Sequence, residues 1–217
     1  RTLCVSFDRY GHEMRLAFGA TLLAFYGCDA PGTEGTPPDY GDPLRWSLLE
    51  PGPFNVGFQT WKTQYTPPVG DSPREIAVNL WYPTEDKTGE SAFYMDGFYE
   101  DATVLLNAAP APPLYGTGYP VHVHSHGDRG WGAASADIMR FFASHGWVAA
   151  APDHTDNTLL SSPSPRQTAH YIHRPLDVSA ILTAIDEFEG SDFPDVDVSR
   201  TLMSGHSFGA YTVWSTL

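Results

Sequence analysis

The feature that most constrains this chain is the pentapeptide Gly205-His206-Ser207-Phe208-Gly209, set between a strand-forming and a helix-forming segment. Residues 200–204 predict a short buried strand, and residues 210–214 can begin a helix. In a turn of this kind the central serine occupies a strained backbone position at the end of the strand. Both glycines are needed because a Cβ atom at either position would clash with the neighbouring strand or helix. This context predicts that Ser207 is a nucleophile, and a plain glycine-rich turn is the alternative.

The second half of the chain alternates strand and helix patterns, which bears on that choice. The predicted elements are strands at 121–125, 147–151 and 200–204, a helix at 134–145, and a helix from Pro175 to residue 188. This order predicts a mostly parallel sheet with helices on both faces. In such sheets ligands bind at the carboxyl ends of the strands. Gly127, Asp153 and Ser207 are all predicted to lie at such ends, which favours a functional serine.

The segment before this alternation predicts antiparallel strands. Residues 56–63 and 75–82 read as two strands joined by a hairpin-type loop that is rich in proline and glycine. Residues 94–106 are rich in aromatic side chains and fit either a helix that covers one face or part of an entrance rim.

The N-terminal residues resemble an export signal. From Met14 a basic residue is followed by an apolar run too short to span a bilayer, and the run ends at Cys28. Residues 25–28 resemble a bacterial lipobox, which predicts that Cys28 is lipidated and that the protein is held in the bacterial cell envelope. Residues 29–51 are rich in proline and glycine and predict a tether. A buried N-terminal helix is the alternative for residues 1–28.

Charge and cysteine content narrow the possible partners. The formal net charge is −14 and the pI is about 4.8. Nucleic acids and anionic membrane surfaces require a basic face, so both are excluded as partners, and a membrane contact is expected only through the lipid anchor. The two cysteines, Cys4 and Cys28, support neither a disulfide framework nor a thiolate metal site. We expect no cofactor.

Histidines near the strand ends offer two further hypotheses. His122, His124 and His126 alternate along one strand and are predicted to share a face, so a zinc hydrolase is an alternative function. The competing interpretation is that they pack on the sheet and form hydrogen bonds. His154 follows the next strand and is a candidate for the substrate cleft. Arg174 and Asp177, one helical turn apart, predict a structural ion pair.

Several spaced motifs together resemble one family. The bacterial α/β-hydrolases related to platelet-activating-factor acetylhydrolase, often called dienelactone-hydrolase-like, are similar to this chain over about residues 52–217. The segments that carry the resemblance lie at 52–57, 80–83, 125–127, 143–150, 153–154, 174–177 and 205–210. The fold that this implies is an α/β-hydrolase domain at 52–217, preceded by an upstream extension and lipoprotein-type signal peptide at 1–28 and by the tether at 29–51.

The resemblance also implies an activity and its residues. Ser207 would form an acyl-enzyme with a carboxylic ester, such as a small ester or a short-acyl lipid. The backbone N–H groups of Asp128 and Phe208 would stabilise the oxyanion. His126 and Gly127 would lie beside the substrate cleft.

The family order along the chain is Ser, then Asp, then His, and no Asp or His follows Ser207 in this sequence. We therefore expect a C-terminally truncated domain that is inactive as it stands. A non-catalytic envelope lipoprotein on a hydrolase scaffold is the alternative.

Overall fold

The computed structural model describes residues 39–68, 72–114, 116, 118–161, 167–188, 190 and 192–217. The predicted export segment at 1–28 and the first part of the tether lie outside these residues. A compact unit spans Tyr40–Leu217. Within the described ranges, no helix combines the length and the apolar character needed to cross a membrane.

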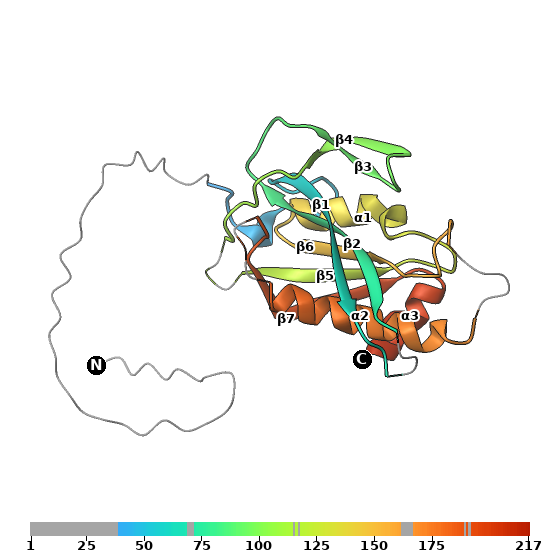
Figure 1. Ribbon diagram of the computed structural model, residues 1–217. Helices are drawn as coiled ribbons and strands as arrows, with labels where there is room; N and C mark the ends of the chain where they lie inside the picture. Colours follow the sequence, from blue (N-terminus) through green and yellow to red (C-terminus); the bar gives the residue numbers. More distant parts are fainter. Residues whose placement is uncertain are drawn as a thin grey trace, which may run out of the picture. The chain divides into compact units, whose positions relative to one another are not determined.

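The described strands form one sheet of seven, in the order β3-β4-β1-β2-β6-β5-β7 (Figure 1). Their bounds are β1 Asn55–Tyr65, β2 Arg74–Thr84, β3 Ser91–Tyr94, β4 Tyr99–Leu106, β5 Tyr119–Ser125, β6 Val148–Asp153 and β7 Val196–Gly205. β5 is parallel to both β6 and β7, and β4 is parallel to β1, whereas β2 runs antiparallel to its two neighbours. The carboxyl ends of β5, β6 and β7 therefore meet at one edge.

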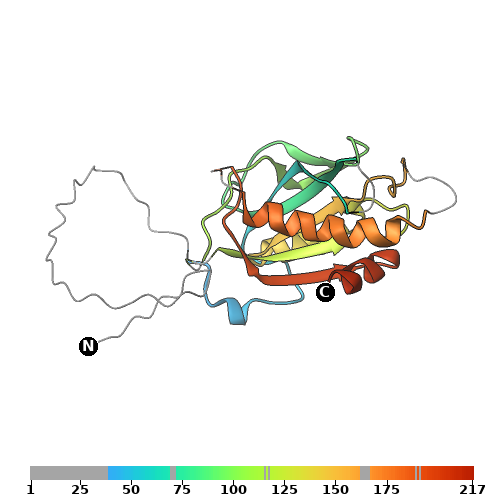
Figure 2. The same cartoon turned by 60° about the horizontal axis from the view of Figure 1, so that its bottom comes forward.

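Helices cover both faces of this sheet. They are α1 Ala136–Ser144, α2 His170–Asp186 and α3 Phe208–Thr216, with short 3-10 helices η1 Pro43–Arg45 and η2 Gly132–Ser135. Met139 of α1 packs in a core with Ala149, whereas Ile181 of α2 packs in a second core with Ala150. Because adjacent strand residues point to opposite faces, these two cores lie on opposite sides of the sheet. Figure 2 shows α2 lying along the second face.

The predicted strands and the alternating order are confirmed, with two differences. The first is that α2 begins at His170 rather than at Pro175, which lies inside the helix. A proline there leaves the carbonyl of Tyr171 without its helical N–H donor. In this protein that carbonyl accepts a hydrogen bond of 3.3 Å from the Tyr211 hydroxyl of α3. A contact between helices thus compensates for the interior proline.

The second difference lies in residues 94–106, where the helix, one of the two alternatives for this segment, is wrong. This segment contributes the end of β3, a tight turn and β4. Met95, Asp96 and Gly97 all have positive φ, which allows the chain to reverse over a few residues. The hydroxyl of Tyr94 accepts a hydrogen bond of 3.0 Å from the indole of Trp81 and donates one of 3.0 Å to Asp101, which fixes the hairpin to β2.

The end of the predicted tether packs on the domain. The ring of Tyr40 is tilted against that of Phe54 with ring centroids 4.3 Å apart, and Trp46 lies edge-on to the Phe54 ring at 6.2 Å. The backbone N–H of Gly52 donates to Ser144 Oγ at 2.9 Å. The compact unit therefore begins at Tyr40, before the predicted boundary at residue 52.

Candidate active site

Ser207 lies between the end of β7 and the start of α3, and its side chain is exposed. Its backbone angles are φ 52° and ψ −116°, a conformation that a non-glycine residue rarely adopts. A Cβ atom on Gly205 would lie 2.3 Å from the backbone of Gly209, and one on Gly209 would lie 1.8 Å from the carbonyl oxygen of Ser125. The strand, strained turn and helix that the motif predicts are therefore all present, and both glycines are required by close backbone contacts.

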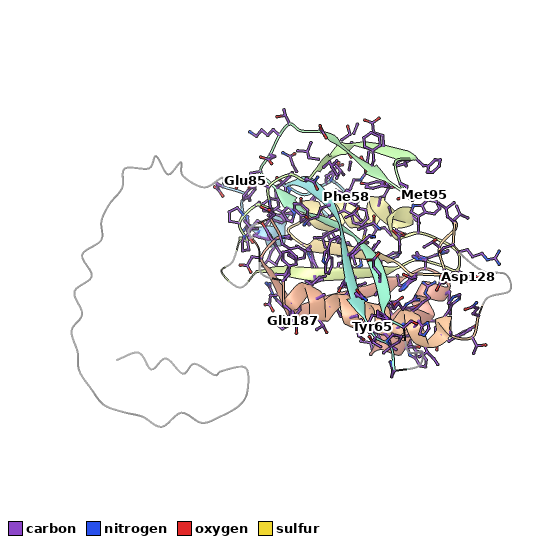
Figure 3. The ribbon with its side chains drawn as sticks, in the orientation of Figure 1. Phe58, Tyr65, Glu85, Met95, Asp128 and Glu187 are labelled. Carbon is purple, nitrogen blue, oxygen red and sulfur yellow. The ribbon has the colours of Figure 1, made fainter. Side chains whose placement is uncertain are left out.

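The turn around Ser207 is held against the loop that follows β5. The N–H of His206 donates to the carbonyl oxygen of Ser125 at 3.1 Å. A Cβ atom built on Gly127 would lie 3.5 Å from the Cβ of Ser207, so Gly127 lies directly beside the serine. Asp128 follows in the same loop and is labelled in Figure 3; its carboxylate accepts a hydrogen bond of 2.9 Å from Asn157 Nδ2. The fold thus brings Gly127 and Asp128 to the start of α3.

His126 and His154 are buried beneath this loop, with exposed fractions of 1% and 0%. The Nδ1 of His126 lies 2.7 Å from the carbonyl oxygen of Gly127, and its Nε2 accepts the backbone N–H of His154 at 3.2 Å. Burial lowers the pKa of His126 to about 2, and repulsion by His154 and Arg174 adds to this. The expectation that both histidines line the substrate cleft is therefore corrected: they support the loop from below.

His154 belongs to a hydrogen-bonded line that also contains Ser125 and Asp177. Its Nε2 lies 2.8 Å from Ser125 Oγ and its Nδ1 lies 2.8 Å from Asp177 Oδ2. Ser125 Oγ also accepts from Arg174 at 3.0 Å, so its own hydrogen is directed to His154. The imidazole proton then resides on Nδ1 and is donated to Asp177. All three side chains of this Ser–His–Asp line are 0% exposed, so it is structural.

Asp177 is the anion at the centre of the buried network. Its carboxylate accepts two hydrogen bonds from Arg74, at 2.7 and 3.0 Å, and one from the hydroxyl of Tyr65 at 2.8 Å (Tyr65 is labelled in Figure 3). Burial acts to raise the pKa of Asp177, but the hydrogen bonds from His154 and Arg74 outweigh it and the pKa is lowered. The expected Arg174–Asp177 pair is therefore wrong: Arg74 is the cationic partner, because Arg174 reaches toward the loop after β5.

The three histidines of the zinc hypothesis do not share one face. His122 Nε2 and His124 Nδ1 lie 2.7 and 2.8 Å from the same Ser204 hydroxyl, whereas His126 turns to Gly127. The reason is that β5 ends at Ser125, so the alternation of a strand does not continue to His126. In the part of the chain that the structure describes, no group of three or more His, Cys, Asp or Glu side chains could hold a metal ion.

Arg74 and Arg174 are buried residues of the site whose roles were not predicted from the sequence. A signal was present for Arg174, because it falls four residues before Val178 on the apolar stripe that continues through Ile181 and Ile185. Arginine on the buried side of a helix indicates paired polar partners in the core. For Arg74, which begins β2, the sequence carries no comparable signal. A hollow of about 530 Å³ adjoins Arg74, between the start of β2 and the end of β6, and is lined in part by Asp153 and Thr155.

Solved structures to which this chain is similar show its fold. No family model matches the chain, and no curated protein does. Among solved structures, the ferulic acid esterase from Streptomyces cinnamoneus is similar with a TM-score of 0.62 and 23% identity, over 78% of this chain and 57% of that one. The chain has the α/β-hydrolase fold.

More distant similarities are to other hydrolases. The acetyl xylan esterase from a Paenibacillus species has a TM-score of 0.43 and 17% identity, and the match covers 73% of this chain and 44% of that one. A dienelactone hydrolase-like promiscuous phosphotriesterase from metagenomic libraries has a TM-score of 0.45 and 20% identity, and the match covers 73% of this chain and 53% of that one. The chain thus spans 57%, 53% and 44% of the length of the ferulic acid esterase, the phosphotriesterase and the acetyl xylan esterase, respectively.

Proposed function

We propose that this protein is a serine hydrolase of carboxylic esters in which Ser207 forms an acyl-enzyme. The observation that carries the proposal is the backbone of Ser207, held at φ 52° between β7 and α3 with Gly127 beside it. A strained turn of this kind presents the serine Oγ beyond the end of the sheet. The α/β-hydrolase fold supports the proposal, because its ligands meet the carboxyl ends of the parallel strands.

The proposed reaction has two half-steps. Ser207 Oγ adds to the carbonyl carbon of the ester, its proton passes to a general base, and the carbonyl oxygen becomes an oxyanion near the N–H groups of Asp128 and Phe208. Phe208 is the first residue of α3, and N–H groups in the first turn of a helix have no acceptor within that helix. The alkoxide then leaves with a proton, and water hydrolyses the acyl-enzyme by the reverse sequence. Loss of one such donor costs a factor of about 10² to 10³ in kcat.

The general base is proposed to lie beyond residue 217. The resemblance implies an Asp and then a His after the nucleophile, and the chain spans 57% of the ferulic acid esterase to which it is similar. His154 is unsuited to this role because it is fully buried and both of its ring nitrogens are occupied by Ser125 and Asp177.

The proposed substrate is an uncharged ester with a small or short-acyl group. Aromatic side chains border the nucleophile: the ring of Phe208 lies 4.9 Å from that of Tyr171 and 5.7 Å from that of Tyr211. Tyr171 is 42% exposed, so it offers an apolar surface at the start of α2. The net charge of −14 disfavours anionic substrates by long-range repulsion.

A fluorophosphonate probe tests the proposal, because it modifies an activated serine covalently. We expect labelling of the full-length protein at Ser207 and its loss in Ser207→Ala. Ser199→Ala is the matched control, since Ser199 is exposed near the other end of β7 and should leave labelling unchanged. Undiminished labelling of Ser207→Ala would overturn the assignment, and an unlabelled wild-type protein would favour a non-catalytic scaffold.

We also propose that the protein is anchored in the bacterial cell envelope through a lipid on Cys28. The support is the apolar run that ends at a lipobox-like segment, followed by a tether. Cys28→Ser is expected to move the protein from the membrane fraction to the soluble fraction, as judged by fractionation of cells that express it. Cys4→Ser is the control and should leave the protein in the membrane fraction. A Cys28→Ser protein that stays in the membrane fraction would contradict the anchor.

A further inference from the structure

Arg174 is a fully buried arginine of α2 whose guanidinium lies against the loop after β5. Its Nη2 donates to Ser125 Oγ at 3.0 Å and to the carbonyl oxygen of His126. Its Nη1 donates to the Asn157 side chain and, at 3.4 Å, to the carbonyl oxygen of Gly127. One side chain therefore contacts three consecutive residues, Ser125 at the end of β5 and His126 and Gly127 in the loop that runs beside Ser207.

The other edge of the same guanidinium contacts α3. Its Nε donates to Thr212 Oγ1 at 3.1 Å, and its central carbon lies 4.6 Å from the centroid of the Phe208 ring. A guanidinium is planar and its donors point in fixed directions. Arg174 therefore fixes the distance and the angle between the loop after β5 and the helix that follows Ser207.

The contact with Gly127 bears directly on one proposed oxyanion donor. The carbonyl oxygen of Gly127 accepts from Arg174, from His126 Nδ1 at 2.7 Å and from the N–H of Gly130 at 3.2 Å. The same peptide group carries the N–H of Asp128, and in a trans peptide the C=O and N–H point in opposite directions. Fixing the carbonyl therefore fixes the direction of the Asp128 N–H.

We infer that Arg174 is a positioning residue that sets the geometry of the oxyanion hole from beneath. Arg174 orients the N–H of Asp128 through the carbonyl groups of His126 and Gly127. It orients the N–H of Phe208 through Thr212 and the ring of Phe208. The inference rests on the proposed ester hydrolysis and adds a residue that does not touch the substrate, because Arg174 is 0% exposed.

A purely structural role would predict a different outcome for substitution. Buried polar networks can often be replaced by apolar side chains of similar volume with little loss of stability, provided that no charge is left unpaired. If Arg174 served only to fill the core, a methionine that keeps its length would retain kcat in the folded protein. If it positions the donors, kcat falls while substrate binding in the ground state is preserved.

The test compares wild type, Arg174→Met and Arg174→Lys in the full-length protein with a p-nitrophenyl ester and a trifluoromethyl ketone. The ketone adds to Ser207 and forms an oxyanion, so its inhibition constant measures how well the oxyanion hole stabilises that charge. For Arg174→Met we expect kcat to fall by about 100-fold, the loss typical of a misplaced donor, with KM changed less than about threefold. The inhibition constant should rise in parallel with the fall in kcat. The kcat and the inhibition constant of Arg174→Lys should lie between those of wild type and Arg174→Met, because an ammonium cannot donate to both carbonyl groups and to Thr212 at once.

Thr212→Val provides a milder variant in case the Arg174 variants do not fold. It removes one acceptor of the guanidinium and should lower kcat by roughly 3- to 10-fold, with a matching rise in the inhibition constant. Thr216→Val is the matched control, since Thr216 lies one turn further along α3 and bonds to the carbonyl groups of Thr212 and Pro175. Its kcat should be unchanged.

Two results would overturn the inference, and they differ from failure of the proposed function. The first is a folded Arg174→Met protein with the wild-type kcat and inhibition constant. The second is a Thr212→Val protein that behaves as Thr216→Val does. Ser207→Ala is measured alongside: if that variant keeps its activity, ester hydrolysis at Ser207 fails, and the positioning role of Arg174 fails with it.

Discussion

Replacement of Gly209 by alanine is expected to destabilise the domain by about 3 kcal/mol or more and to abolish the reactivity of Ser207. The added Cβ would lie 1.8 Å from the carbonyl oxygen of Ser125 and 2.7 Å from that of His126. Both atoms belong to the backbone at the end of β5, so no side chain can rotate to make room. Relief of the clash requires α3 to move away from β5, and that movement separates Phe208 from the loop that carries Asp128.

Urea unfolding and fluorophosphonate labelling measure the two parts of this prediction. Gly116→Ala is the matched control, because a Cβ atom at Gly116 has no neighbour within 4 Å and should change the free energy of unfolding by less than about 0.5 kcal/mol. A Gly209→Ala protein with wild-type stability and labelling would show that the turn is wider than the structure has it. The comparison isolates the close approach from the general effect of adding a methyl group to glycine.

The turn around Ser207 could be predicted because its geometry is encoded locally. Five consecutive residues specify the strained serine and the two glycines, and the strand and helix patterns on either side are short-range signals. The order of strands and helices could also be predicted, because parallel β-α-β connections allow few topologies. These two kinds of information were enough for the fold and for the position of Gly127 beside Ser207.

Two elements were not predictable in this way, because contacts between distant segments decide them. Pro175 is an ordinary helix start in the sequence, whereas in the structure α2 continues through it and the hydroxyl of Tyr211, on another helix, donates to the carbonyl of Tyr171. The hairpin of β3 and β4 depends on the hydrogen bonds that join Trp81, Tyr94 and Asp101. Aromatic composition alone does not distinguish such a hairpin from a helix.

The buried residues beneath the site were also not predictable from the sequence, because contacts between distant positions decide their roles. His154 follows a strand end and so resembles a cleft residue in the sequence, but its environment is set by Ser125 and Asp177, which lie 29 and 23 positions away. Motif spacing identifies the residues that carry the proposed chemistry. The residues that hold them are identified only when α2 is packed on the sheet.

Acidification from pH 6.5 to pH 4 is expected to destabilise the protein by several kcal/mol. Burial lowers the pKa of His122 and of His154 to about 4 and that of His126 to about 2, and burial also lowers the pKa of His124. In the unfolded chain each would titrate near the ordinary histidine value of about 6.5. The unfolded state therefore binds more protons in this range. Stability is fully present above about pH 6.5 and is lost as the pH falls toward 4.

The slope of this dependence can be tested with single variants. Each histidine that is neutral when folded and charged when unfolded contributes about 1.4 kcal/mol per pH unit. His122→Met removes one such group, so its free energy of unfolding, measured with urea at several pH values, should fall less steeply by about that amount. Ile181→Val is the control: loss of a buried methyl costs about 0.5–1.5 kcal/mol at every pH and leaves the slope unchanged.

Buried carboxylates modify this dependence without reversing it. Burial raises the pKa of Asp153, which acts in the opposite sense, because the folded state then holds a proton that the unfolded chain has released. The pKa values of Asp101 and Asp177 are lowered, so these carboxylates also make the folded state less stable as the pH falls. Their effect begins only near the ordinary carboxyl value of 3.8, below the range in which the histidines act. Four imidazoles act in one direction and Asp153 alone acts in the other, so the window between pH 6.5 and about 4 is governed by the imidazoles. A free energy of unfolding that stays constant across that window would show that water reaches these rings in the folded protein.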